Sequence, residues 1–246
     1  MHKRFGFKGV LAAAYVMALA AMAAAGAPPV LPKAGTYLSS AYIAALQEQK
    51  SHFKAVGASA DPQAVYILRD TEGNFVLDAS VGFAYQASAT YDPKSQTYFF
   101  EDPYASGKKP YIWVDATHFK IGRGKHQTTY TYVGDGQEFG GEQSFLIATM
   151  LAGSYRDARG QKYVFGADGK AQFPDRTFRV QILTNTLDES WDQIIAHTGE
   201  KDEISDYIAF VWRGKTLFLY NCDPDADTAG CTPDRKHPIA VLHKAD

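Results

Sequence analysis

Short apolar runs separated by turn-forming residues follow one another along most of the chain from residue 64 onward. β-Branched and aromatic residues are frequent in these runs, and in several of them apolar and polar positions alternate, which is typical of strands. Turn sequences such as Asp70-Thr71-Glu72-Gly73 join neighbouring runs, as expected in β-hairpins. The pattern predicts about ten strands, with hairpins at residues 64–77, 86–101, 111–133, 162–173 and 207–220 and further strands at 177–184 and 239–243.

Three other segments have helical spacing. Ser39 or Ser40 can cap a helix that runs to about Lys50, whose apolar side chains lie on one face. Residues 144–151 are short and apolar, and residues 188–197 place apolar side chains at helical spacing after a group of acids. The sequence therefore predicts a mainly β protein with two or three short helices.

Hairpins at this density favour an antiparallel barrel or a sandwich. We expect a single domain over residues 28–246, with an N-terminal helix at about 39–50. A faint internal similarity links the segment from Phe119 to Tyr132 with the segment from Phe210 to Tyr220. The matched residues are too few to establish a duplication.

One hairpin resembles a known family. Gly153-Ser154-Tyr155, the strand at residues 162–165 and the tight turn at Asp168-Gly169 are similar to the first hairpin of lipocalin-like (calycin) barrels, which opens with Gly-x-Trp or a similar motif. Here Tyr replaces Trp, and the motif lies in mid-chain. The resemblance covers roughly residues 150–245. It implies an antiparallel up-and-down barrel of about 8–10 strands with a cavity, and a protein that binds a ligand and has no catalytic residues.

The first 27 residues have the pattern of a cleaved signal peptide. Lys3, Arg4 and Lys8 precede an uncharged, Ala-rich stretch at residues 9–27 that ends in small side chains. A permanent membrane anchor is the alternative, but the stretch is rich in Ala and not in Leu. The sequence predicts a periplasmic or secreted protein without a membrane span after cleavage.

Charge and cysteine content narrow the possibilities further. The 27 acids outnumber the 25 Lys and Arg residues, so a nucleic-acid partner is not expected. Cys222 and Cys231 are the only cysteines. In an oxidising compartment they are expected to form a disulfide that closes a short loop.

The segment that begins at Cys222 also has acidic residues at the spacing of a calcium loop. Asp223, Asp225, Asp227 and Asp234 occupy the first, third, fifth and twelfth positions, where short oxygen ligands converge on a cation. The sixth position lacks the glycine that the sharp turn of such loops needs. A solvated acidic loop is therefore the preferred interpretation, calcium remains the alternative, and no other cofactor is predicted.

Histidines and carboxylates do not form a recognisable catalytic arrangement. Asp115, His118 and His126 come from one hairpin, but Asp115 and His118 are three residues apart and would face opposite sides of a strand. Asp192 and His197 have the spacing of an acid–base pair on the expected helix at 188–197. A solvated helix face with acids near its positive end explains them better. No catalytic residue is predicted, and we do not expect an enzyme.

Aromatic side chains are the other notable feature. Rings make up 13% of the chain, and several fall on neighbouring strands. They are expected either to pack in the β-core or to line a pocket for an apolar or sugar ligand. The candidate ligand-binding residues are Tyr98, Tyr111, Trp113, Tyr130 and Tyr132.

The leading hypothesis is an exported, non-enzymatic, lipocalin-like protein that binds a small apolar molecule or a glycan. The alternative is a periplasmic inhibitor or immunity-type protein that binds a protein partner through the loop at residues 222–234. A third possibility is a hydrolase whose catalytic residues the sequence does not reveal.

Overall fold

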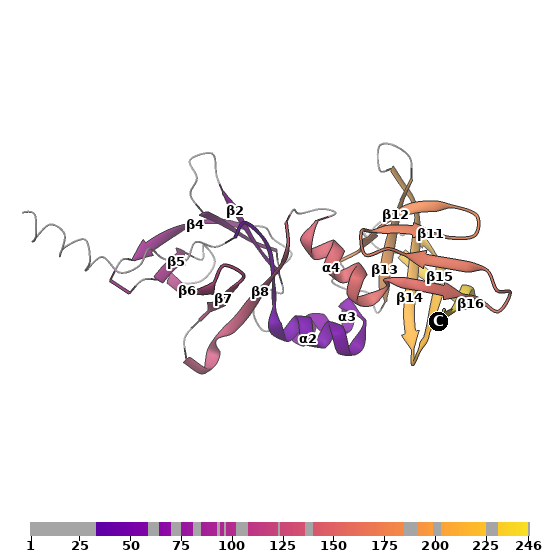
Figure 1. Ribbon diagram of the computed structural model, residues 1–246, viewed down its shortest axis with the longest axis horizontal. Helices are drawn as coiled ribbons and strands as arrows, with labels where there is room; N and C mark the ends of the chain where they lie inside the picture. The colour runs from indigo at the N-terminus through magenta and orange to yellow at the C-terminus, as the bar shows by residue number, and fades with distance from the viewer. Residues whose placement is uncertain are drawn as a thin grey trace, which may run out of the picture. The chain divides into compact units, whose positions relative to one another are not determined.

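The computed structural model describes residues 33–58, 64–69, 75–80, 85–92, 94–95, 97–101, 108–122, 124–135, 140–184, 191–198, 203–224 and 231–245. Within these residues the protein is mainly β, with three α-helices among sixteen strands (Figure 1). The predicted signal peptide lies outside the described residues.

The first eight strands form a closed antiparallel barrel. Each strand pairs with the next along the chain, and the last pairs with the first through the register Tyr37↔Tyr132 and Ser39↔Tyr130. The strands are β1 (Gly35–Ser39), β2 (Ala64–Arg69), β3 (Phe75–Ser80), β4 (Tyr85–Asp92), β5 (Thr97–Glu101), β6 (Lys108–Asp115), β7 (His118–Ile121) and β8 (Thr128–Gly134).

The next eight strands form a second closed barrel with the same order. It closes where β16 pairs with β9, through His243↔Arg156 and Lys244↔Tyr155. The strands are β9 (Gly153–Arg156), β10 (Lys162–Phe165), β11 (Lys170–Gln172), β12 (Thr177–Ile182), β13 (Asp192–Thr198), β14 (Glu203–Arg213), β15 (Thr216–Pro224) and β16 (Cys231–Lys244).

The predicted antiparallel barrel is confirmed, but the strands close into two barrels where the sequence suggested one. A barrel closes when its first strand pairs with its last, and those strands are far apart in sequence. No local pattern marks that pairing. A series of hairpins therefore has the same sequence pattern whether its strands close into one barrel or into two.

Two of the predicted helices are present. In α2 (Ser40–Gln49), the Ser39 side chain accepts a hydrogen bond of 3.2 Å from the Tyr42 backbone N–H, as expected of an N-cap. A short helix α3 (His52–Ala55) follows, and α4 (Gly141–Met150) precedes the second barrel.

The predicted helix at 188–197 is wrong. Residues 192–198 form the strand β13, which pairs with β12 on one side and β14 on the other. All but the last of its residues are buried. The consecutive β-branched residues Ile194 and Ile195 suit a strand that is covered on both faces.

One end of the second barrel is covered by α4, and we call it the closed end. Gln143 bonds the backbone of Ile182 at the end of β12, and the Met150 carbonyl accepts from Trp212 at the end of β14. A Cβ atom at Gly169, in the turn between β10 and β11, would lie 3.6 Å from Ile147. The α2 side chains Tyr42 and Leu46 join the same core.

Both barrels begin with the same local arrangement of a glycine and a buried tyrosine. In each first strand, a glycine with positive φ, Gly35 or Gly153, is followed two residues later by a buried tyrosine. The Tyr37 hydroxyl donates to the carbonyl of Lys33 at 2.7 Å, and the Tyr155 hydroxyl donates to the carbonyl of Leu151 at 2.6 Å. In both cases the acceptor lies four residues earlier in the chain.

The partners of these tyrosines are also equivalent. Tyr37 packs on Trp113 with ring centroids 6.1 Å apart, and Tyr155 packs on Trp212 at 6.2 Å. Trp113 lies in the sixth strand of its barrel, and Trp212 lies in the sixth strand of the other. The two halves therefore share contacts as well as strand order. The sequence similarity between residues 119–132 and residues 210–220 does not follow this repeat, because the first segment covers the seventh and eighth strands of its barrel and the second covers the sixth and seventh.

The buried hydroxyl of Tyr155 gives a first prediction. Its burial raises its pKa to about 12, so the group is a neutral donor throughout the physiological range. Tyr155→Phe leaves the Leu151 carbonyl without this donor, and we expect the free energy of unfolding to fall by about 1 kcal/mol. Urea denaturation measures the change.

Tyr207→Phe is the matched control, because Tyr207 is half-buried and its hydroxyl bonds no described residue. It should alter the free energy of unfolding by less than about 0.5 kcal/mol. Equal losses in the two variants would contradict the role given to the Tyr155 hydrogen bond.

Candidate functional site

A cavity of about 330 Å³ lies at the other end of the second barrel, which we call the open end. Its walls come from β10, from the turn between β11 and β12, and from β15 and β16. Because β9 separates β10 from β16 around the barrel, a cavity lined by both lies in the barrel mouth. The lining includes Gln161, Tyr163, Phe173, Arg176, Asn221 and Ile239.

Aromatic side chains form the floor of this cavity. Tyr163 and Phe173 are both buried, and their rings meet edge to face with centroids 5.0 Å apart. Phe173 makes a similar contact of 4.8 Å with Phe178, deeper in the core. This interlocked packing holds the floor in one shape, as in a pre-formed ligand pocket.

The polar side of the cavity centres on Arg176. Its guanidinium forms an ion pair with Asp206 and lies 5.3 Å from the ring centroid of Phe178. Its Nε atom is buried and bonds no described residue. A buried donor without an acceptor costs about 1–3 kcal/mol, and this one belongs to a residue that lines the cavity.

The net charge of the open end limits what it can bind. Asp206 already neutralises Arg176, and Asp175 adds a negative charge to the lining. Gln161 and Asn221 contribute neutral amide groups. The cavity therefore has no positive charge left over for an anion, and its neutral amide groups favour a neutral partner with hydroxyl or carbonyl oxygens.

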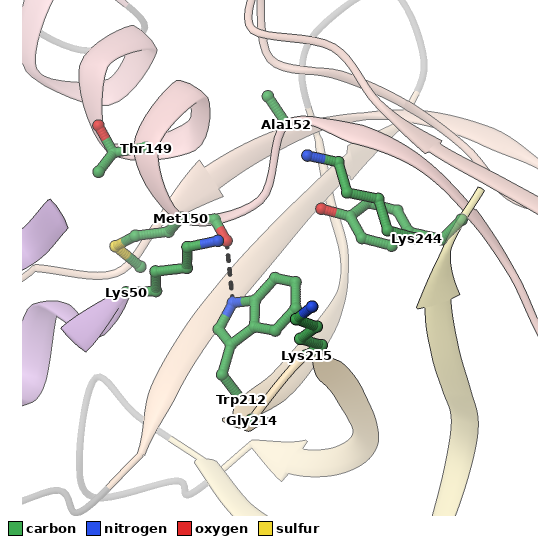
Figure 2. Close-up of a pocket in the computed structure, with 9 residues that line it drawn as sticks. Lys50, Thr149, Met150, Ala152, Trp212, Gly214, Lys215 and Lys244 are labelled. Carbon is green, nitrogen blue, oxygen red and sulfur yellow. Dashed lines mark hydrogen bonds between the residues drawn. The ribbon is translucent and has the colours of Figure 1, made fainter. Parts of the chain in front are cut away.

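A second pocket, of about 160 Å³, lies at the closed end of the same barrel (Figure 2). It is bounded by the ends of α2 and α4, by the turn between β14 and β15, and by the end of β16. Its chemistry differs from that of the open end, since Lys50, Lys215 and Lys244 all line it.

Four of the five aromatic residues singled out from the sequence meet inside the first barrel. Phe119 is their common neighbour: it stacks on Tyr130 with centroids 5.0 Å apart, stacks on Tyr111 at 5.7 Å and meets Trp113 at 4.7 Å. Tyr98 joins through Trp113 at 6.5 Å. Phe119 was not singled out from the sequence, although its alternation with Ile121 in β7 indicates an inward position.

Tyr132 has a different environment. Its hydroxyl donates to Asp135 at 2.5 Å, and the Lys33 ammonium lies 4.0 Å from its ring centroid. Its ring also meets the buried Tyr37 at 5.5 Å. These contacts place Tyr132 near the barrel surface, and a ligand-binding role for the five aromatic residues stays a prediction.

The predicted calcium loop lies largely outside the described residues. This applies to Asp225, Asp227 and the side chain of Asp223. Asp234 is exposed and accepts hydrogen bonds from the Lys236 backbone N–H and from His237. These bonds lower the pKa of its carboxyl group, with His237 contributing most. Calcium binding stays a prediction.

The cysteines lie on neighbouring strands. Cys222 in β15 is opposite Pro233 in β16, and Pro224 is opposite Cys231. Residues opposite each other share a face, so the two cysteines lie on one face as diagonal neighbours. The described residues include no free cysteine. The side chain of Cys231 lies outside them, so the disulfide stays a prediction.

The separation expected for Asp115 and His118 is wrong. His118 Nδ1 lies 3.0 Å from the Asp115 carboxylate, and these residues pair across the turn between β6 and β7. The register shifts between Trp113 and Asp115, so simple alternation fails there. Together with the hydrogen bonds from Thr117, which contribute most, this contact lowers the pKa of Asp115 to about 2. His126 is exposed in the following turn, and the described residues contain no cluster suited to a metal ion.

The solvated helix face expected for Asp192 and His197 is also wrong, because both are buried in β13. Asp192 accepts a 3.0 Å hydrogen bond from the Phe53 backbone N–H, and His197 Nε2 lies 3.1 Å from the Gln181 amide oxygen. Each side chain thus has a structural partner, which does not suggest an acid–base pair.

No protein-family model, curated protein or solved structure matches this chain. Among the described residues, no helix has the length and apolar character needed to cross a membrane. The function is therefore inferred from the geometry of the two barrels.

Proposed function

We propose that this protein is an exported, lipocalin-like binding protein that holds a small uncharged ligand in the open end of the second barrel and does not transform it. The single observation that carries the proposal is the cavity of about 330 Å³ itself, which combines an aromatic floor with polar lining residues, among them Arg176. This volume falls within the range of small-molecule sites.

The lining contains both aromatic and polar side chains, which favours a glycan fragment over a purely apolar molecule. Tyr163 and Phe173 offer ring surface, while Gln161 and Asn221 offer hydrogen-bonding groups. A hydrocarbon would bury these polar groups without partners, at about 1–3 kcal/mol each. A sugar ring has both apolar faces and hydroxyl groups, so it satisfies both halves of the cavity.

The arrangement of the barrel supports the same proposal. α4 covers the closed end, so the mouth opposite it is the natural entrance for a ligand. The resemblance of Gly153-Ser154-Tyr155 to the opening of lipocalin-like barrels points the same way. The protein-binding alternative depends on the loop at residues 222–234, of which residues 225–230 lie outside the described residues, and it stays a prediction.

The test is a titration of the protein with maltose and chitobiose as neutral sugars and with decanol as an apolar probe, followed by NMR. Binding should shift the Arg176 Nε–H resonance and the Asn221 side-chain amide. Asn221→Ala and Gln161→Ala each remove one hydrogen-bonding group from the rim. Each should weaken sugar binding about tenfold, which corresponds to one hydrogen bond.

Gln172→Ala is the control, because Gln172 is an exposed amide of β11 that does not line the cavity. The affinity of this variant for the sugars should equal that of the unmodified protein. The proposal fails if no probe shifts an open-end resonance at millimolar concentration. It also fails if the two rim variants bind as tightly as the control.

A further inference from the structure

The closed-end pocket brings together three cations from three separate elements. Lys50 follows α2, Lys215 lies in the turn between β14 and β15, and Lys244 ends β16. In Figure 2 the Lys50 and Lys215 side chains lie beside the indole ring of Trp212, and the Lys244 ammonium points toward Ala152. The pocket lining contains no carboxylate, and none of the three lysines forms an ion pair with a described residue.

The surroundings of the lysines are fixed in position. The Trp212 indole N–H donates to the Met150 carbonyl at 2.9 Å, and its ring packs on Tyr155. The Lys50 ammonium lies 4.9 Å from the centroid of the Trp212 ring. The Lys50 backbone is left-handed, and its N–H bonds the Leu46 carbonyl at the end of α2. The cations are thus attached to a rigid frame, although their side chains are exposed.

Two helix ends offer a simpler explanation for the lysines, because cations near helix C-termini are stabilising. α2 and α4 both end at this pocket, at Gln49 and Met150. Each C-terminus carries roughly −0.5 of an elementary charge, so both together offset only about one of the three lysines. About two positive charges remain uncompensated among the described residues.

The shape of the charge distribution indicates the class of anion. Lysines act as separate point charges, whereas a planar carboxylate is best recognised by the two parallel hydrogen bonds of an arginine. The nearby Arg213 is not part of the lining, and its guanidinium lies 4.7 Å from the centroid of the Phe218 ring. Three ammonium groups around one small space suit a compact, roughly tetrahedral anion with oxygens in several directions.

We propose that the closed-end pocket is a second binding site, which takes a phosphoryl group with two negative charges. The group is an inorganic phosphate or the terminal phosphate of a monoester, which can be a soluble molecule or a lipid headgroup. The pocket holds about 160 Å³, enough for the phosphoryl group but not for a bulky substituent, which would extend into solvent. The proposal does not rest on ligand binding at the open end.

The experiment titrates the full protein with inorganic phosphate and with glycerol phosphate at low ionic strength. Saturable binding should shift the Trp212 indole N–H resonance and should weaken as salt is added. Lys50→Gln, Lys215→Gln and Lys244→Gln should each weaken binding about threefold, as expected for one partly exposed ion pair. The triple variant should weaken it at least about tenfold.

The matched control is a triple variant that loses the same net charge elsewhere: Lys120→Gln, Lys125→Gln and Lys162→Gln, none of which lines the pocket. Its affinity for phosphate should stay within about twofold of the unmodified protein. Equal losses in the two triple variants would overturn the proposal, because they would show a response to overall charge and not a site.

A vesicle assay separates the two sources of the group. Vesicles with phosphatidic acid are compared with vesicles of phosphatidylcholine alone. Co-sedimentation with the first only, lost in the pocket variant, supports a lipid headgroup. Binding of glycerol phosphate without vesicle binding supports a soluble monoester. Failure of phosphate, glycerol phosphate and vesicles alike overturns the site and leaves the open-end proposal unaffected.

Discussion

Replacing Gln143 with alanine is expected to lower the free energy of unfolding by about 2–5 kcal/mol. Gln143 is a buried residue of α4, and its side chain bonds both backbone groups of Ile182: its amide donates to the carbonyl at 3.0 Å, and its oxygen accepts from the N–H at 2.7 Å. The substitution leaves a buried donor and a buried acceptor without partners.

The position of Ile182 explains why these groups need a side chain. β11 pairs with β12 only from Thr177 to Arg179, and the Gly169 carbonyl accepts from Val180 just beyond it. Ile182, two residues further, has no strand on that side. Gln143 takes the place of the missing strand. The substitution therefore removes the hydrogen bonds that join α4 to the barrel.

Chemical denaturation of Gln143→Ala and Gln143→Met measures this effect. Methionine fills a similar volume but makes neither hydrogen bond, so it separates the polar contribution from the cavity. We expect Gln143→Met to lose most of the stability that Gln143→Ala loses. A methionine variant as stable as the unmodified protein would show that packing alone matters at this position.

Acidification from pH 7 toward pH 5 is expected to destabilise the protein through His52. This histidine is buried in α3, where its Nδ1 lies 2.5 Å from the Tyr42 hydroxyl and its Nε2 lies 3.3 Å from the Thr184 carbonyl. A carbonyl can only accept, so Nε2 carries the proton and Nδ1 accepts from Tyr42. The arrangement suits the neutral ring.

The direction in which the pKa of His52 shifts decides whether the free energy of unfolding rises or falls with pH. Burial lowers the pKa of His52, although nearby Asp192 partly opposes the effect. Below the ordinary pKa of about 6.5, the unfolded chain takes up a proton that the folded chain refuses. The free energy of unfolding should therefore fall as pH falls, by up to about 1.4 kcal/mol per pH unit, until the folded pKa is reached.

Asp192 changes the free energy of unfolding in the opposite direction as the pH falls. Burial raises the pKa of its carboxyl group, so the folded state holds a proton more tightly than the unfolded state does. Stability from this group is gained as pH falls through the raised pKa toward about 3.9. The loss due to His52 should thus be steepest just below pH 6.5 and should be partly recovered in more acidic solution.

Urea denaturation at several pH values tests both groups. His52→Gln should remove the loss just below pH 6.5, and Asp192→Asn should remove the recovery in more acidic solution. His126→Gln, an exposed histidine in the first barrel, should keep the pH profile of the unmodified protein. An unchanged profile in His52→Gln would refute the assignment.

Local patterns in the sequence predicted most of the hairpins, the cap of α2 and the mainly β class correctly. The hairpin expected at residues 111–133 is wrong in part, because a turn at residues 116–117 divides its first strand into β6 and β7. They failed where the outcome depends on distant residues. Residues 192–198 have an ambiguous spacing, and the flanking strands β12 and β14 decide that they are a strand. The pairing of Asp115 with His118 depends on a local shift of register that alternation does not reveal.

The candidate sites could not be predicted from local sequence patterns for the same reason. The open-end cavity gathers Gln161, Arg176 and Asn221, which no spacing rule connects, because the closure of the barrel brings them together. The three lysines of the closed-end pocket come from positions 50, 215 and 244. The aromatic cluster was easier to anticipate, since its members lie on consecutive hairpins.

The way α2 and α3 enter the core bears on how the chain acquires its structure during synthesis. All eight strands of the first barrel have been made before residue 150, and each pairs with a near neighbour in sequence, which favours early formation. Tyr42, Leu46 and Ala55, however, belong to a core completed by Phe165, Ile194 and other residues of the second barrel. A nascent chain of this length therefore exposes apolar side chains that it cannot bury until the second barrel has been made.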